Sequence, residues 1–439
     1  MIAFGSSRSI PPAQPALHST LALGGIAVIG IDRRRRLVGG VAVWLALAAS
    51  ASATPQPENQ AAPTGKPNAP FELKDGDRVV LLGGTFIERD QSYGYLETLL
   101  TSRFPRRNVT FRNLGWSGDT VWGEARSRFG PPAEGFAHLK NHVTALKPTL
   151  IFVNYGLNES FAGKAGLPRF KAGLDTLLDV LDKTGARVVL ITPRRLEKLA
   201  PPLPDPAAAN ARLADYVAVL RDAAARRKYR LVDLFDRWIP DPKRPLTDNG
   251  VHLTEAGYAA AAVAIARELG VALQPVVIGR AADPAASIDI RSNGVVFAAA
   301  HAEVGAELPL AGVESIVIDT ASLRPAGAIF NLAVDGKVVT PLHSATNAAG
   351  RFAPLRIAAD VAQSERLRAA VNAKNELYFY RWRPQNETYL FGFRKHEQGN
   401  NAREIPLFDP LVAAREAEIA KLRVPPPHTY EIIRQEQGQ

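Results

Sequence analysis

Four short segments rich in glycine and polar residues follow stretches that have the composition of buried β-strands. They are Gly83-Gly84-Thr85 and residues 113–120, 156–159 and 246–253. Because ligands of open α/β sheets bind just beyond the carboxyl ends of the strands, we expect these segments to share one site. The two glycines permit a sharp turn that presents Thr85 at the strand exit. A threonine hydroxyl can attack an acyl group, so acyl transfer is a chemistry open to such a site.

Each segment on its own also has a structural interpretation. Gly83 and Gly84 are equally typical of a plain strand-to-loop turn, with Thr85 as a helix cap. Asn158 can satisfy backbone groups of its loop, and His252 can be a hydrogen-bonded structural histidine. The functional interpretation therefore depends on the four segments occurring together and in this order.

Short apolar runs predict the strands that would position these segments. The runs are residues 78–82, 109–113, 149–155, 186–192 and 231–235. Helical patterns cover residues 93–104 and 210–227, and Thr254 caps an alanine-rich helix that ends near residue 269. This alternation predicts an α/β domain over residues 71–272.

The sequence changes in character after residue 274. Short strand-like runs separated by turn residues predict a small β insert at residues 275–345. Residues 346–439 form a predicted C-terminal extension, with helices near 355–371 and 410–422 and an aromatic segment at 377–382 between them. We interpret the aromatic segment as core or interdomain packing, with a sugar-binding platform as the alternative.

Residues 78–270 resemble the SGNH (GDSL-type) esterase and lipase superfamily, which has a flavodoxin-like, three-layer α/β/α fold with a parallel sheet. The family's Gly-Asp-Ser block lies over Gly83-Gly84-Thr85, and its second-block glycine lies over Gly118. Its Gly-x-Asn-Asp block lies over residues 156–159, and its Asp-x-x-His block lies over residues 249–252. The C-terminal part of the chain resembles extensions on SGNH-like proteins of Planctomycetes-type bacteria.

The resemblance implies a hydrolase of carboxylic esters, with an acetyl ester of a carbohydrate or small molecule as substrate and no cofactor. It assigns Thr85 as the nucleophile and His252 as the general base, with Asn249 or the adjacent Asp248 orienting the imidazole. It also implies an oxyanion hole made of three donors: the backbone N–H of Thr85, the backbone N–H of Gly118 and the side-chain amide of Asn158.

Several positions depart from the family pattern. Thr85 replaces the serine nucleophile, and its methyl group restricts the rotamer and crowds the path of attack. Asn249 replaces an aspartate, and the same change in a serine protease lowers kcat by about 10⁴-fold. Gly84 and Glu159 replace two further aspartates. We expect an ester hydrolase; the alternative is a catalytically degenerate SGNH domain that binds a glycan or a partner protein.

Other candidate sites are weaker. Ser117 does not complete a Gly-x-Ser-x-Gly motif because Asp119 occupies the last place, so we interpret it as loop packing. His138 and His142 are four residues apart, but no glutamate completes a His-Glu-x-x-His motif, so we predict no metal site. The absence of cysteine excludes disulfides and thiolate metal ligands.

The N-terminal region accounts for part of the net charge of +10 over 439 residues. Four arginines at 33–36 precede an apolar run at 37–49 and the small residues Ala51-Ser52-Ala53, which is the order of a secretory signal. We expect residues 1–53 to be a signal peptide or an uncleaved anchor, residues 54–70 a linker, and the protein to be exported to the periplasm or exterior of a bacterium. Beyond residue 53, 48 basic and 42 acidic residues are interleaved, which predicts no nucleic-acid partner, and no other membrane span is predicted.

Overall fold

The computed structural model describes most of the chain after residue 69. It covers residues 70–271 except 129 and 239–242, and residues 277–278, 288–290, 316–319, 329–343, 352–355, 358–424 except 398 and 400, and 428–434. The predicted signal or anchor at 1–53 lies outside the described residues, as does the predicted linker apart from residue 70. Within the described ranges, no helix combines the length and apolar character needed to cross a membrane.

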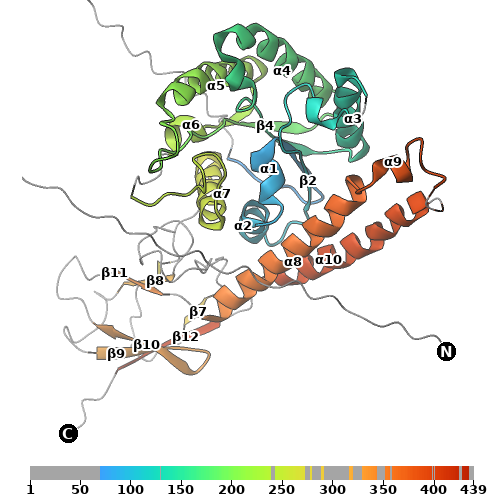
Figure 1. Cartoon of the computed structure of the whole chain (residues 1–439). Helices are drawn as coiled ribbons and strands as arrows, with labels where there is room; N and C mark the ends of the chain where they lie inside the picture. Colours follow the sequence, from blue (N-terminus) through green and yellow to red (C-terminus); the bar gives the residue numbers. More distant parts are fainter. Residues whose placement is uncertain are drawn as a thin grey trace, which may run out of the picture. The chain divides into compact units, whose positions relative to one another are not determined.

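A parallel five-stranded sheet forms the centre of the first domain, with strand order β2-β1-β3-β4-β5 (Figure 1). The strands are β1 (Arg78–Gly83), β2 (Thr110–Gly115), β3 (Leu150–Asn154), β4 (Arg187–Ile191) and β5 (Arg230–Val232). Their apolar residues run almost without interruption because helices cover both faces of the sheet. All five predicted strands are confirmed, and the order is that of flavodoxin-like doubly wound folds.

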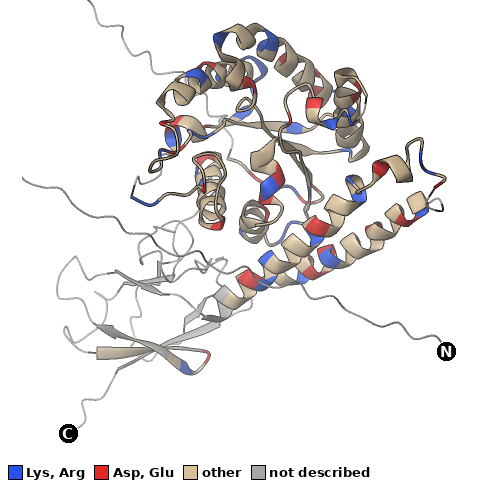
Figure 2. Ribbon diagram, in the orientation of Figure 1, with Lys and Arg blue, Asp and Glu red and all other residues tan. Residues whose placement is uncertain are grey.

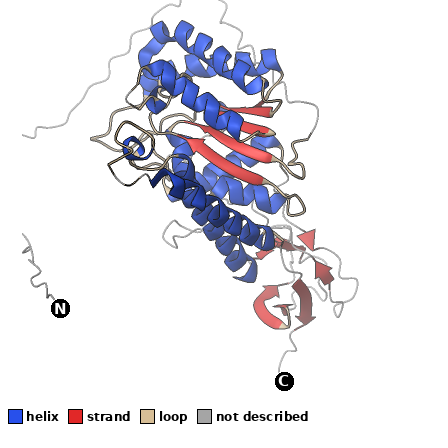
Figure 3. Cartoon of the chain, turned by 90° about the vertical axis from the view of Figure 1, so that its right-hand side faces the viewer, coloured by secondary structure: helices blue, strands red, loops and turns tan. Residues whose placement is uncertain are grey.

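Two helical layers enclose this sheet, as Figure 3 shows from the side. Val79 and Leu81 of β1 belong to the core cluster that includes buried residues of α2 (Tyr95–Arg103) and α7 (Glu255–Leu269). Val80 and Leu82 belong to the cluster that includes α3 (Pro132–Ala145), α4 (Leu167–Asp182) and α5 (Ala207–Arg227). Successive residues of a strand point to opposite faces, so this division confirms the three-layer α/β/α fold.

The region after residue 274 contains two small sheets. One has the order β10-β9-β12-β7, from β7 (Ile288–Ile290), β9 (Ile329–Val334), β10 (Lys337–His343) and β12 (His428–Arg434). The other has the order β11-β8-β6, from β6 (Val277–Ile278), β8 (Ile316–Asp319) and β11 (Phe352–Leu355). Two strands lie outside the predicted insert of 275–345. Strand β11 follows it and pairs with β8. Strand β12 returns from near the end of the chain to pair with both β7 and β9.

Two long helices, α8 (Ala358–Trp382) and α10 (Phe408–Leu422), are the main elements described in the C-terminal extension. The aromatic segment at 377–382 is not a separate element, because α8 continues through it to Trp382. Tyr378 and Trp382 are buried in the core cluster that includes α3 and α4, which confirms the packing interpretation for these two residues. Phe379, by contrast, lines an open pocket beside Trp116.

Ion pairs attach the helix pair to the first domain. Lys374 of α8 contacts Glu97 of α2 at 2.7 Å, and Arg368 of α8 contacts Glu255 of α7 at 3.2 Å. Arg112 of β2 also pairs with Glu416 of α10. Figure 2 shows basic and acidic residues interspersed along the ribbon of these two helices.

Candidate active site

The turn between β1 and α1 (Thr85–Asp90) presents Thr85 at the carboxyl end of the sheet. A Cβ atom on Gly83 would lie 2.5 Å from the backbone oxygen of Asn154, so only glycine fits this close approach of β1 to β3. Thr85 is half-buried, and its Oγ1 accepts a hydrogen bond from the backbone N–H of Gly118 at 3.3 Å. Its own N–H lies in the first turn of α1, where backbone donors have no partner within a helix.

The other two predicted oxyanion donors lie next to Thr85. Gly118 has a φ of +78°, a conformation that favours glycine, and this conformation directs its N–H at the Thr85 hydroxyl. The Asn158 amide nitrogen is 3.5 Å from the position that a Cβ atom of Gly84 would take. One amide hydrogen of Asn158 is donated to the backbone oxygen of Asp119 at 2.7 Å, which leaves the second for a ligand.

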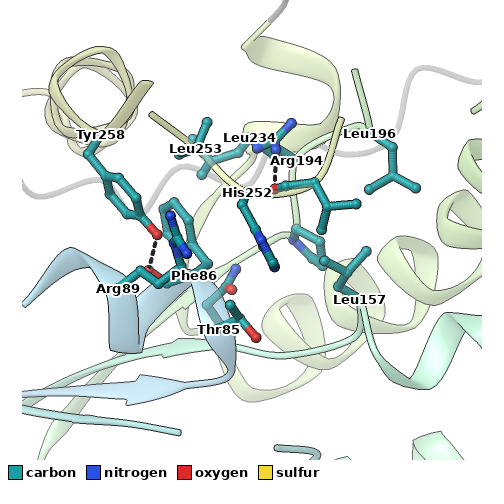
Figure 4. A pocket seen from close by; sticks show the side chains of 13 residues that line it. Thr85, Phe86, Arg89, Leu157, Arg194, Leu196, Leu234, His252, Leu253 and Tyr258 are labelled. Atoms are coloured by element: carbon teal, nitrogen blue, oxygen red, sulfur yellow. Dashed lines mark hydrogen bonds between the residues drawn. The ribbon is translucent and has the colours of Figure 1, made fainter. Parts of the chain in front are cut away.

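A tight loop before α7 carries His252. The loop is closed by a bridge between Thr247 and Leu253 and by the Asp248 N–H, which donates to the His252 carbonyl at 2.9 Å. Thr254 caps α7 by accepting from the Gly257 N–H at 3.1 Å, as predicted. The His252 ring enters the pocket that Thr85 lines (Figure 4). The described contacts include no hydrogen bond between the Thr85 hydroxyl and the His252 ring.

Asn249 determines the protonation pattern of the His252 ring. Its Oδ1 accepts from the N–H groups of Val251 at 3.0 Å and His252 at 2.8 Å, which fixes the orientation of the amide. The remaining nitrogen, Nδ2, lies 3.3 Å from His252 Nδ1. Because Nδ2 can only donate, the neutral ring must accept at Nδ1 and carry its proton on Nε2. A general base facing Thr85 needs the opposite tautomer.

The order of these elements and residues corresponds to a known family. A model of the GDSL-like Lipase/Acylhydrolase family matches residues 76–260. We call residues 76–260, which this model matches, the GDSL-like domain. The match covers the sheet, Thr85 and His252, and it stops inside α7, before the small sheets and the C-terminal helix pair.

Several solved structures are similar to part or most of the chain. BT4096, a gut microbial diltiazem-metabolizing enzyme, has the same fold at 14% identity and a TM-score of 0.61, covering 83% of this chain and 98% of its own. Axe2, an acetylxylan esterase from Geobacillus stearothermophilus, is 20% identical with 46% and 97% coverage and a TM-score of 0.37. LAE5, an alpha/beta hydrolase enzyme from the metagenome of Lake Arreo, Spain, is 24% identical with 45% and 97% coverage and a TM-score of 0.37. A search of curated proteins found no match.

Asn249 and Asp248 are the two candidates for orienting His252, and only Asn249 contacts the ring. The Asp248 carboxylate lies 3.8 Å from the guanidinium of Arg89, and 57% of its side chain is exposed. It affects His252 only through its charge, which partly opposes the lowering of the histidine pKa. The sequence left both residues open, and the geometry selects Asn249 as the residue in contact.

The pKa of His252 lies below its ordinary value of 6.5, mainly because the ring is partly desolvated and secondly because Arg89 is nearby. The neutral ring is the only form that can accept a proton, so activity should rise with pH through this lowered pKa. We expect the acid limb of kcat/KM for an ester to have its midpoint below pH 6.5. A pH–rate profile from about pH 4 to 8 measures it, and a midpoint above 6.5 would contradict this environment for His252.

Sequence reasoning missed two residues that line the same pocket, Arg89 and Arg194. Arg89 lies one helical turn beyond Thr85 on α1, and Arg194 follows the carboxyl end of β4 by three residues. Ligands of such sheets bind beyond the strand ends, and β4 ends three residues before Arg194, so this rule could have predicted Arg194 as a site residue. Arg89 had no comparable signal, because helical arginines are common on solvated surfaces.

Glu159, at a position where the family has aspartate, holds two loops of the site together. Its carboxylate accepts from the N–H groups of Val121 at 2.9 Å and Gly156 at 2.8 Å. Burial raises its pKa to about 7, although these hydrogen bonds oppose the rise. Glu159 therefore links the loop that carries Gly118 to the loop that carries Asn158.

The weaker candidates are all engaged elsewhere. Ser117 is exposed, does not line the pocket, and its backbone N–H donates to Glu88. His138 Nδ1 lies 2.8 Å from the backbone oxygen of Arg126, and His142 packs against the Trp382 ring. Among the described residues, no group of three or more His, Cys, Asp or Glu side chains is placed to hold a metal ion.

Proposed function

We propose that the GDSL-like domain is an ester hydrolase that uses Thr85 as nucleophile and His252 as general base. The observation that carries this proposal is that the Thr85 hydroxyl and the His252 ring line one pocket, with the donors of Gly118 and Asn158 beside Thr85. The resemblance of residues 78–270 to the SGNH superfamily suggests the acetyl ester of a carbohydrate as the substrate class. Export across the bacterial membrane is suggested by the order of residues 33–53.

The proposed reaction has two acyl-transfer steps. Thr85 Oγ1 attacks the ester carbonyl while His252 Nε2 takes its proton, and the oxyanion is held by the N–H donors around Thr85. His252 returns the proton to the departing alcohol, which leaves an acyl group on Thr85. Water, deprotonated by His252, then releases the carboxylic acid and restores the hydroxyl. The first step requires the His252 tautomer that Asn249 disfavours, so we expect a slow enzyme.

Three single variants of the full chain test this proposal on an acetylated monosaccharide. We expect Thr85→Ala to reduce hydrolysis to the background rate and His252→Ala to reduce kcat/KM by at least about 10²-fold. Ser117→Ala is the matched control, since it removes a nearby hydroxyl outside the pocket, and it should retain the parent rate. Loss of activity in Ser117→Ala with full activity in Thr85→Ala would contradict the assignment of Thr85 as the nucleophile.

The orientation of Asn249 favours a second candidate function, a non-catalytic module that binds a glycan or a partner protein. A ring whose Nε2 carries the proton donates a hydrogen bond into the pocket, which suits binding of an acceptor group. Measurements on the parent protein distinguish the esterase from the binding module. A folded parent that hydrolyses no acetylated sugar, yet binds one in a manner sensitive to His252→Ala, would overturn the esterase proposal in favour of the module.

A further inference from the structure

The pocket that contains Thr85 and His252 has an unusual charge balance. Two guanidinium groups, of Arg89 and Arg194, line it, and no aspartate or glutamate does so among the described residues. Much of the remaining wall is apolar, including Phe86, Leu157 and Leu234. Figure 4 shows Arg89, Arg194 and His252 among the residues that line the pocket. Both guanidinium groups lower the pKa of His252, which agrees with their lying close to the ring.

Arg194 is a buried cation for which the described residues provide no anionic partner. Its exposed fraction is 9%, and none of its described hydrogen bonds or ion pairs is with a carboxylate. Its described hydrogen bonds go to the backbone oxygens of Arg195, at 2.7 Å, and Val251. Burial lowers its pKa to about 10, and the more distant Glu197 opposes this only in part. An unpaired buried charge is costly, so a ligand that supplies a negative charge would be stabilised here.

Arg89 provides a second, independent observation. Its Nε is buried and has no hydrogen-bond partner among the described residues. The only described ion pair of Arg89 is the exposed contact with Asp248 at 3.8 Å, and contacts of this kind contribute little. A buried donor without a partner normally costs stability, and a bound acceptor would remove that cost.

We propose that Arg89 and Arg194 form a subsite for a carboxylate that the ligand carries beside its ester group. Guanidinium groups recognise carboxylates through paired, charge-assisted hydrogen bonds, and the apolar wall strengthens such contacts by excluding water. The substrate class is therefore an acylated acidic sugar, with a hexuronic acid as the alcohol part. Turnover of this substrate rests on the proposed esterase function, whereas binding of the carboxylate does not.

Calorimetric titration of the full chain with glucuronate and with glucose tests the subsite without turnover. We expect glucuronate to bind at least about 10-fold more tightly than glucose, and Arg194→Met or Arg89→Met to weaken glucuronate binding by about 10- to 100-fold. Arg195→Met is the matched control, because that neighbouring arginine pairs with Asp236 at 2.6 Å and does not line the pocket. Arg89→Met carries the test if Arg194→Met does not fold.

Kinetics on matched esters separate failure of the subsite from failure of the enzyme. A preference for acetylated glucuronate over acetylated glucose that disappears in Arg89→Met supports the subsite. A preference for a neutral sugar esterified with succinate instead would keep the carboxylate subsite but overturn the acidic sugar as the alcohol part. Binding of glucuronate without any hydrolysis supports the subsite and overturns the esterase. Equal binding of glucuronate and glucose by a parent that hydrolyses neutral esters overturns the subsite alone.

Discussion

Asn249→Asp should raise kcat/KM for an acetyl ester by about 10²- to 10⁴-fold. The side chain keeps its shape, so one oxygen can still accept from the N–H groups of Val251 and His252. The second oxygen takes the place of Nδ2, 3.3 Å from His252 Nδ1, and can only accept. The ring must then carry its proton on Nδ1, which frees Nε2 to accept the proton of Thr85. The new carboxylate also stabilises the imidazolium formed during attack.

Two measurements connect this gain in rate to the tautomer of His252. The ¹⁵N shifts of the ring should indicate an Nε2-protonated ring in the parent and an Nδ1-protonated ring in Asn249→Asp. The added negative charge should raise the pKa of His252, so the acid limb of kcat/KM should move to higher pH. Asp248→Asn is the control on the same loop: it changes a charge without touching Nδ1, and we expect a change of only a few-fold. An unchanged rate with an Nδ1-protonated parent ring would refute the role given to Asn249.

Thr85 limits what this substitution can restore. The threonine methyl group remains in the first turn of α1 and restricts the side chain to few rotamers, one of which accepts from the Gly118 N–H. Asn249→Asp corrects the base and leaves the nucleophile hindered. The two departures from the family pattern thus have different effects. Asn249 determines which nitrogen of His252 carries the proton, whereas the methyl group of Thr85 hinders the approach of the hydroxyl to the ester.

The parts of the site that could be predicted from the sequence are those that depend on residues close together along the chain. Thr85 and Gly118 lie in turns whose glycines have specific backbone requirements, and each turn directly follows a strand. The strand order of a doubly wound sheet then brings such turns to one edge. The orientation of Asn249 is also local, since its oxygen binds N–H groups two and three residues along the chain. The tautomer of His252, however, can be inferred only from the position of the imidazole ring relative to the Asn249 amide, which the sequence does not give.

The contacts that the sequence did not predict join distant parts of the chain. Strand β12 pairs between β7 and β9, and nothing in residues 428–434 indicates where its partners lie. Arg383, just beyond α8, stacks on Trp116 with its guanidinium carbon 3.6 Å from the ring centroid and contacts Glu88 at 3.1 Å. Glu88 in turn accepts from the N–H of Ser117, next to Gly118. The C-terminal extension thus supports the loop that carries a proposed oxyanion donor, a role that helical periodicity cannot reveal.

Lys374→Met should lower the free energy of unfolding by about 3–5 kcal/mol. The Lys374 ammonium lies 2.7 Å from both carboxylate oxygens of Glu97 and 3.1 Å from the backbone oxygen of Phe111. Only 1% of the Lys374 side chain and 5% of the Glu97 side chain are exposed. Burial lowers the pKa of Lys374 and raises that of Glu97, so each charge depends on the other to remain ionised. Removing the ammonium leaves a carboxylate buried without its cationic partner.

The pair also tests whether α8 is part of the folding unit of the GDSL-like domain. Replacing both partners, Lys374→Met with Glu97→Met, removes the unpaired charge and should recover most of the loss, because a packed apolar pair can match a buried ion pair. Arg415→Met removes an exposed pair with Glu418 and should cost less than about 1 kcal/mol. Denaturant unfolding followed by two probes measures all three variants. If Lys374→Met changed only the transition of the helix pair, α8 would fold separately; a single shifted transition makes the extension integral to the domain.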